Sequence, residues 1–175
     1  MNIIMTGSTS FVGAATVREL LRRGHTVTAI VRPKSSKLDT ILEGNEEALL
    51  SGRLLVTEND LSEPEKLLEK VTKPQDVFCH FGWGGSGSVS RTDKALQEKN
   101  MEISLETIRT AKALGCKKFL FSGSQAEYGM HQDLITENTV CEPKSLYGEA
   151  KLAMREKGEK LCDELGLRYI HARIF

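Results

Sequence analysis

The sequence has little that would attract a strongly charged or membrane-bound partner. Its 24 Lys and Arg residues are balanced by 24 Asp and Glu residues, so the formal net charge is zero. A neutral chain lacks the basic surface that attracts nucleic acid or anionic lipid. No apolar stretch is long enough to span a bilayer, and the first residues form a strand pattern rather than a secretion signal. We therefore predict a cytoplasmic protein with no nucleic-acid or membrane partner.

Cysteine is also scarce, and its spacing matches no common metal-binding motif. The chain has four cysteines, which lie far apart and form no CxxC or Cys/His pattern: Cys79, Cys116, Cys141 and Cys162. Widely spaced thiols are typical of reduced proteins, in which each cysteine behaves as a small buried apolar residue. We predict free thiols and no metal site.

Short apolar strand patterns alternate with helical patterns along the whole chain. The expected strands cover 2–6, 26–31, 53–57, 76–81, 117–122 and 168–175. The expected helices cover 11–23, 38–50 with an interruption near Gly44, 63–71 with Ser62 as its cap, 93–114 and 143–165. This alternation predicts one doubly wound α/β domain of the Rossmann type over 1–175, with a parallel sheet in the order 3-2-1-4-5-6. Ligands would bind at the carboxyl ends of the strands, where the first and fourth strands separate.

The first strand leads into a turn of small residues and then a helix. Gly7 can adopt the backbone angles of a sharp turn, and Gly13 lets the helix pack close to the strand. A helix N-terminus offers unpaired N–H groups and a partial positive charge to a pyrophosphate. Ser10 stands at the middle position of the usual three-glycine pattern, where it narrows the approach but could donate its hydroxyl hydrogen. Alone, this turn fits an ordinary strand–helix connection equally well.

Three further features indicate chemistry. Tyr147 and Lys151 are four residues apart, so the phenol and the ammonium share a helix face, where a cation stabilises phenolate and suits it to acid–base work. Ser124 follows the fifth strand and could orient a substrate oxygen, although Ser and Gly there could also simply form a turn. Asn100 lies within a helix, where it either bonds locally or has another role. Taken alone, a Tyr-x-x-x-Lys spacing is also common on solvated helices.

The motifs occur in a fixed order along the chain: Thr6-Gly7-x-x-x-Phe11-x-Gly13, Asp60-Leu61, Asp76-Val77-x-x-His80, Asn100, Ser122-x-Ser124, Tyr128-Gly129 and Tyr147-x-x-x-Lys151. Together they resemble the extended short-chain dehydrogenase/reductase family, in particular its NAD-dependent epimerase/dehydratase group. The resemblance covers the whole chain. It implies a dinucleotide cofactor and an enzyme.

The resemblance also implies a role for each matching position. The pyrophosphate would be lined by Gly7, Ser10, Phe11, Val12 and Gly13. The adenine would meet Asp60 and Leu61, and the cofactor ribose would lie beside His80, Phe81 and Gly82. The catalytic residues would be Ser124, Tyr147 and Lys151, of which Tyr147 and Lys151 would also contact the cofactor. Asn100 would support Lys151 through a water molecule.

The end of the second strand departs from the pattern of an NAD-specific enzyme. No acidic residue follows Val31 to hold the ribose diol, and Arg32 comes instead. Arg32, with Lys34, Ser35 and Lys37, could hold a 2′-phosphate, which predicts NADP rather than NAD; the alternative is a solvated basic loop. Trp83 stands where the family has small residues. We interpret it as a lid over the core rather than a platform for substrate.

The resemblance implies an oxidoreductase that acts on a nucleotide sugar by hydride transfer assisted by Tyr147 and Lys151. The alternatives are an NADPH-dependent carbonyl reductase and a non-catalytic, redox-sensing dinucleotide module, but the Tyr/Lys pair favours an enzyme. Members of the family continue into a substrate domain. The chain is therefore expected to be an N-terminal part, inactive alone, whose open last strand, 168–175, would favour self-association.

Overall fold

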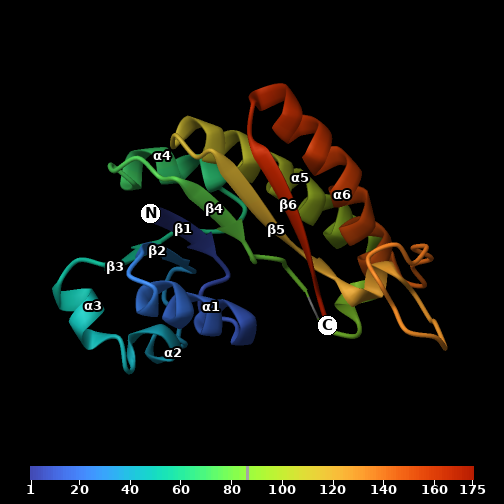
Figure 1. Cartoon of the computed structure of the whole chain (residues 1–175), viewed down its shortest axis with the longest axis horizontal. Coiled ribbons are helices and arrows are strands. Elements are labelled where there is room, and N and C mark those ends of the chain that lie inside the picture. Colours follow the sequence, from blue (N-terminus) through green and yellow to red (C-terminus); the bar gives the residue numbers. More distant parts are fainter. Residues whose placement is uncertain (86) are drawn as a thin grey trace.

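The computed structural model describes residues 1–85 and 87–175, and within them it shows one parallel sheet (Figure 1). The strand order is β3-β2-β1-β4-β5-β6, which confirms the predicted topology. The strands are β1 (Asn2–Thr6), β2 (Thr26–Val31), β3 (Leu54–Glu58), β4 (Val77–His80), β5 (Lys118–Ser124) and β6 (Arg168–Ile174). Every neighbouring pair is parallel, as right-handed crossovers through helices require.

Helices lie on both faces of this sheet, as Figure 1 shows. They are α1 (Phe11–Arg22), α2 (Asp39–Leu42), α3 (Glu46–Leu50), α4 (Leu67–Lys70), α5 (Lys94–Ala113) and α6 (Leu146–Leu165), with 3₁₀ turns η1 (Pro64–Lys66), η2 (Ser90–Thr92) and η3 (Gln125–Glu127). The helices α1, α2 and α3 pack on one face, and α4, α5 and α6 pack on the other.

Alternation along the strands builds two separate apolar layers. In β1, Ile4 joins the layer under α4, α5 and α6, while Ile3 and Met5 join the layer under α1, α2 and α3. Successive side chains of a strand point to opposite faces, so both faces of a central strand must be apolar. Phe78 of β4 and Phe119 of β5 stack in the first layer with ring centroids 5.6 Å apart. The sheet is thereby fixed from both sides, and its carboxyl ends are held as a rigid edge.

The predicted cap of the helix after β3 is wrong. Ser62 does not cap that helix; its backbone N–H and its hydroxyl both donate to the Asp60 carboxylate, at 2.9 and 2.6 Å. The helical segment begins instead at Pro64, whose fixed φ and missing N–H suit a first helical position. The acidic side chain of Asp60, two positions earlier, takes the hydrogen bonds of Ser62 that a helix cap would otherwise use.

The start of α6 also differs from the prediction. The helix begins at Leu146 rather than at Pro143, because the Ser145 hydroxyl accepts from the Gly148 N–H at 3.1 Å and acts as the N-cap. The predicted interruption of the helix at 38–50 is confirmed. Gly44, with φ of 75°, separates α2 from α3.

Within the described residues, no helix is both long and apolar enough to cross a membrane. In the same part of the chain, no three His, Cys, Asp or Glu side chains gather as metal ligands would. The four cysteines are free thiols, and burial raises the pKa of Cys79, Cys116 and Cys162 to about 12. These three thiols therefore stay protonated near neutral pH. β6 ends the sheet order, so the predicted pairing of its edge with another copy stays a prediction.

The close packing at Gly13 leads to a testable prediction. A Cβ built there would overlap the Gly7 carbonyl, so Gly13→Ala should force the start of α1 away from β1. We expect the free energy of unfolding to fall by about 1–3 kcal/mol, the usual cost of overpacking, as measured by urea denaturation. Gly87→Ala is the matched control, because its Cβ would meet no described atom within 4 Å. Equal stability of the two variants would contradict the close packing of helix and strand.

Candidate dinucleotide and catalytic site

A cleft of about 430 Å³ opens at the carboxyl ends of β1, β2 and β4. This is the place that the predicted topology assigns to a ligand. Its lining includes these residues predicted to bind a cofactor: Gly7, Ser10, Arg32, Asp60, Leu61, Phe81 and Gly82. Other predicted cofactor residues lie outside the lining: Phe11, Val12, Gly13, His80, Tyr147 and Lys151. Phe11 in particular is 94% exposed at the start of α1.

The glycine turn after β1 has the geometry of a cradle. Gly7 has φ of 69°, and a Cβ there would lie 2.6 Å from the carbonyl carbon of Phe81 at the end of β4. The turn therefore tolerates no side chain at this point. Ser10 is the N-cap of α1, and its hydroxyl oxygen accepts from the Gly13 N–H at 3.0 Å. The hydroxyl hydrogen is not used in that bond, which is compatible with the predicted donation to a phosphate.

His80 is fully buried beneath the cleft, where its hydrogen bonds define its tautomer. Ser104 donates its hydrogen to the Asn100 carbonyl at 2.8 Å, so its oxygen accepts from Nε2–H of His80 at 3.1 Å. Nδ1 then accepts from the Thr6 hydroxyl at 2.9 Å, and that oxygen accepts from the Gly82 N–H. Burial and the charge of Lys151 lower the pKa of His80 to about 3. The ring is thus a neutral bridge between β1, β4 and α5, and its neighbours Phe81 and Gly82 line the cleft.

Asn100 holds the loop that follows β4. Its side-chain oxygen accepts from the Gly84 N–H at 3.0 Å, and its amide nitrogen donates to the Gly84 carbonyl at 2.8 Å. The side chain is buried, with 4% of its surface exposed. Its role in the structure is to position the loop. The predicted water-mediated support of Lys151 stays a prediction.

Tyr147 and Lys151 lie on one face of α6, and Lys151 is 2% exposed. The ammonium donates to the Ser122 carbonyl of β5 at 2.7 Å and lies over the rings of Trp83, Phe121 and Tyr147, at 3.9, 4.6 and 5.7 Å from their centroids. Such ring faces attract a cation. Burial lowers the pKa of Lys151 to about 7, and the charge of Glu127 opposes that effect.

Trp83 connects the cleft to this pair. The residue lines the cleft and packs on the apolar layer under α5 and α6, and its ring meets that of Tyr147 edge-on with centroids 6.2 Å apart. The indole N–H donates to the Gln97 side chain at 2.9 Å, which fixes the plane of the ring. Trp83 therefore both covers the core and forms part of the cleft wall. Its residue type alone did not indicate the second position.

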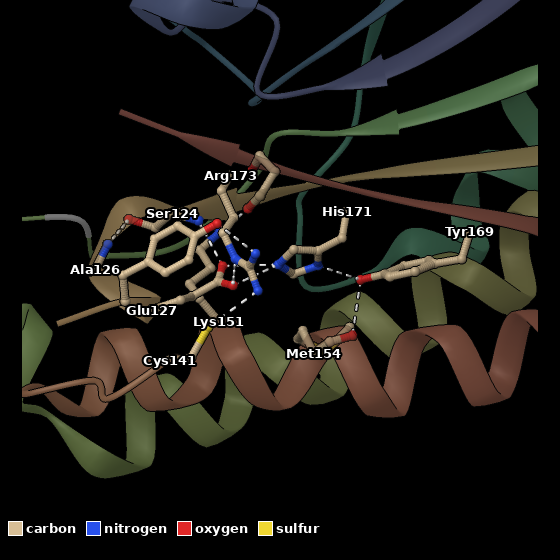
Figure 2. Close-up of polar contacts among 11 residues, drawn as sticks. Ser124, Ala126, Glu127, Cys141, Lys151, Met154, Tyr169, His171 and Arg173 are labelled. Atoms are coloured by element: carbon tan, nitrogen blue, oxygen red, sulfur yellow. Dashed lines mark hydrogen bonds and ion pairs between the residues drawn. The ribbon is translucent and has the colours of Figure 1, made fainter. Parts of the chain in front are cut away.

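Ser124 forms a turn after β5, as one of the two interpretations of the sequence predicted. Its hydroxyl oxygen accepts from the Ala126 N–H at 3.2 Å, and its own N–H donates to the Glu127 carboxylate at 2.7 Å (Figure 2). The only sequence signal for Glu127 was the Ser-x-x-Glu spacing of a capping box.

A second residue that the sequence did not indicate is Arg91, whose guanidinium carbon lies 4.9 Å from the centre of the Tyr147 ring. Its cation faces the predicted acid–base residue from the loop between β4 and α5.

Comparisons with known proteins place this geometry in a family. Residues 3–175 match the model of the NAD dependent epimerase/dehydratase family. The chain is 30% identical to a dTDP-6-deoxy-L-talose 4-dehydrogenase (NAD(+)) of Aggregatibacter actinomycetemcomitans, over 97% of this chain and 60% of that protein. It is 29% identical to a D-erythronate dehydrogenase of Cupriavidus necator, over 99% of this chain and 53% of that protein.

A solved structure of a UDP-glucose 4-epimerase superposes with a TM-score of 0.82 at 27% identity, over 100% of this chain and 51% of that one. The chain thus spans between half and two thirds of the length of these relatives. The sheet order, the cleft at the carboxyl ends of the strands and the match of residues 3–175 lead to one conclusion. The chain belongs to the NAD dependent epimerase/dehydratase family.

Proposed function

We propose that this protein is an NAD(P)-dependent oxidoreductase of the epimerase/dehydratase type that acts on a nucleotide sugar. One observation carries the proposal. The buried ammonium of Lys151 lies 3.9 Å from the ring centroid of Trp83, and the same Trp83 lines the cleft. A cleft that suits a dinucleotide therefore borders directly on an acid–base pair. A module that only bound dinucleotide would have no use for that costly burial of a charge.

The cleft fits the phosphates of a dinucleotide. A Cβ at Gly7 would fill the space against Phe81, and one at Gly82 would lie 2.6 Å from the Leu61 side chain, so both glycines keep backbone accessible. The helix α1, twelve residues long, begins at this turn, and its N-terminus favours an anion. On these grounds Gly7, Ser10 and Gly82 would hold the pyrophosphate and ribose, with Asp60 and Leu61 toward the adenine.

The residues of the pair divide the work of oxidising an alcohol. A bound nicotinamide supplies the acceptor for the hydride that leaves the substrate carbon. Tyr147 would take the hydroxyl proton of that secondary alcohol, which leaves a carbonyl group. Lys151 would stabilise the phenolate form of Tyr147, and Ser124 would hold the substrate oxygen beside it. In an epimerase the hydride later returns to the same carbon, and the proton returns to the oxygen.

The names of the relatives support a nucleotide-sugar substrate. They include UDP-glucose 4-epimerases from Pisum sativum and Lactobacillus helveticus, each 27% identical to this chain. A net dehydrogenase or reductase is the second candidate, because two of the relatives are named dehydrogenases. The two candidates differ in the fate of the cofactor. A dehydrogenase accumulates reduced cofactor in step with its product, whereas an epimerase returns the hydride and accumulates none.

The preferred cofactor in this proposal is NADP. Arg32 and Lys37 both line the cleft beyond the end of β2, where two cations suit a 2′-phosphate. Asp60, which follows β3, already accepts from the backbone N–H and the hydroxyl of Ser62. The Asp60 carboxylate is therefore already engaged by a residue of its own loop.

The cofactor preference can be tested by calorimetric titration of NADP⁺ and NAD⁺. We expect tighter binding of NADP⁺, and Arg32→Ala should weaken it about tenfold, the scale of one charge-assisted hydrogen bond, while NAD⁺ affinity hardly changes. Lys34→Ala is the matched control, because Lys34 belongs to the same basic loop but not to the described lining of the cleft. Tighter NAD⁺ binding that is indifferent to Arg32→Ala would refute the preference.

The acid–base role can be tested with Tyr147→Phe, which keeps the ring that packs against Trp83 and removes the oxygen. Turnover by the full-length protein, with UDP-glucose and dTDP-6-deoxy-L-talose as probe substrates, should fall by about 10²-fold or more, the scale of a positioned proton-transfer group. Dinucleotide affinity serves as the internal control and should stay unchanged. Near-normal turnover of the variant would remove Tyr147 from the mechanism.

A further inference from the structure

A buried cluster of charges lies behind the catalytic turn, and the proposed reaction leaves it without a role. The Glu127 carboxylate has none of its surface exposed. It accepts from the Ser124 N–H at 2.7 Å, from Nε2 of His171 at 2.9 Å and from Nε of Arg173 at 2.8 Å, as Figure 2 shows. A carboxylate so deep in the protein requires charged partners, and it has them in neighbouring strand β6.

The backbone of β5 is shaped around this cluster. Gly123 pairs with Arg173 in the sheet register, and a Cβ at Gly123 would lie 2.5 Å from Nε2 of His171 and 2.6 Å from the Glu127 carboxylate. Any side chain at this position would separate the carboxylate from its partner. The glycine between the Ser122 carbonyl and Ser124 is therefore needed for the ion cluster itself.

The far end of the cluster is fixed to α6. The Tyr169 hydroxyl donates to the Met154 carbonyl at 2.9 Å, so its oxygen is left to accept from Nδ1 of His171 at 3.1 Å (Figure 2). In this geometry both ring nitrogens of His171 face oxygen atoms, one the phenol oxygen and the other the Glu127 carboxylate. The permanent positive charge beside the carboxylate is the guanidinium of Arg173.

The ammonium of Lys151 is held at the same short stretch of β5 as this carboxylate: it donates to the Ser122 carbonyl at 2.7 Å, and the Ser124 N–H donates to Glu127 at 2.7 Å. Burial lowers the pKa of Lys151 to about 7, and the negative charge of Glu127 is the effect that opposes it. The other titratable groups that face Lys151 are the neutral His80 of β4 and Tyr147 of its own helix. Arg91 lies near the same Tyr147 ring, with its guanidinium carbon 4.9 Å from the ring centre. Among these groups, Glu127 alone offers a negative charge.

We propose that Glu127 is a positioning residue of the catalytic site: its carboxylate holds the turn that carries Ser124 and serves as the counter-charge of the Lys151 ammonium. This inference rests on the proposed function, because it assigns the cluster to the acid–base pair of that reaction. It differs in one measurable respect from a purely structural link between β5 and β6. Loss of either partner would weaken a structural link in the same way. A counter-charge predicts opposite effects: loss of the negative charge lowers the pKa of Lys151, and loss of a positive charge raises it.

The test uses two substitutions that remove charges of opposite sign from the same cluster. Glu127→Gln removes the negative charge that pairs with His171 and Arg173, and Arg173→Gln removes a positive charge that pairs with Glu127. The pKa of Lys151 is read from its ¹³Cε resonance by NMR across pH, with the signal assigned by its loss in Lys151→Met. Neither substrate nor cofactor is present, so the result does not depend on turnover.

We expect Glu127→Gln to shift the pKa of Lys151 downward by about one pH unit or more, and Arg173→Gln to shift it upward, since nearby charges have effects of this size. Shifts of the same sign in both variants, or no shift in either, would overturn the inference and leave a structural link. If Glu127→Gln does not fold, Arg173→Gln decides alone: an upward shift supports the inference and any other result overturns it.

This outcome is separable from the test of the proposed function. Loss of turnover in Tyr147→Phe together with shifts of equal sign would retain the enzyme and reject the role of Glu127. Opposite shifts together with full activity of Tyr147→Phe would retain the counter-charge and reject the reaction that we assign to it.

Discussion

The burial of one positive charge is the constraint on which the rest of the site depends. Lys151 is 2% exposed, and an ammonium removed from water is strongly unfavourable unless its surroundings replace the lost hydration. The replacement comes from the Ser122 carbonyl at 2.7 Å and from the faces of Trp83 and Phe121. These groups belong to β5 and to the loop after β4, so α6 can only dock in one register against both. Docking of the helix and placement of the ammonium are the same event.

That register explains why the cleft lies beside Tyr147 and Lys151. Trp83 lies over the Lys151 ammonium and is also one of the residues that line the cleft, and Gln97 accepts from its indole N–H. The loop that carries Trp83 is in turn fixed by the two hydrogen bonds from Asn100 to Gly84. Residues of α5 therefore set the wall between the two halves of the site. The ligand would find this wall already formed, which reduces the ordering cost of binding.

Much of this could be predicted from the sequence because it depends on local patterns. The strand order, the sharp turn at Gly7, the close helix contact at Gly13 and the shared face of Tyr147 and Lys151 follow from spacing along the chain. The Glu127 cluster could not be predicted, because its partners are 44 and 46 residues further along and only the register of β6 brings them together. The prediction for Ser62 was wrong because a nearby carboxylate competes for its hydroxyl. Its hydroxyl belongs to Asp60 rather than to the helix that follows.

The two buried bases at this end of the sheet show how one charge determines its neighbours. His80 and Lys151 both lose hydration on burial, yet the histidine is neutral and the lysine retains a counter-charge. The neutral form of His80 is stable in this position because Thr6 and Ser104 bond both of its ring nitrogens in a single tautomer. The charge of Lys151 is itself one cause of the lowered pKa of His80, since a second cation nearby would be repelled. The neutral bridge beneath the cleft and the cation beside it are therefore one electrostatic arrangement, and a substitution that neutralised Lys151 would relax the constraint on His80 as well.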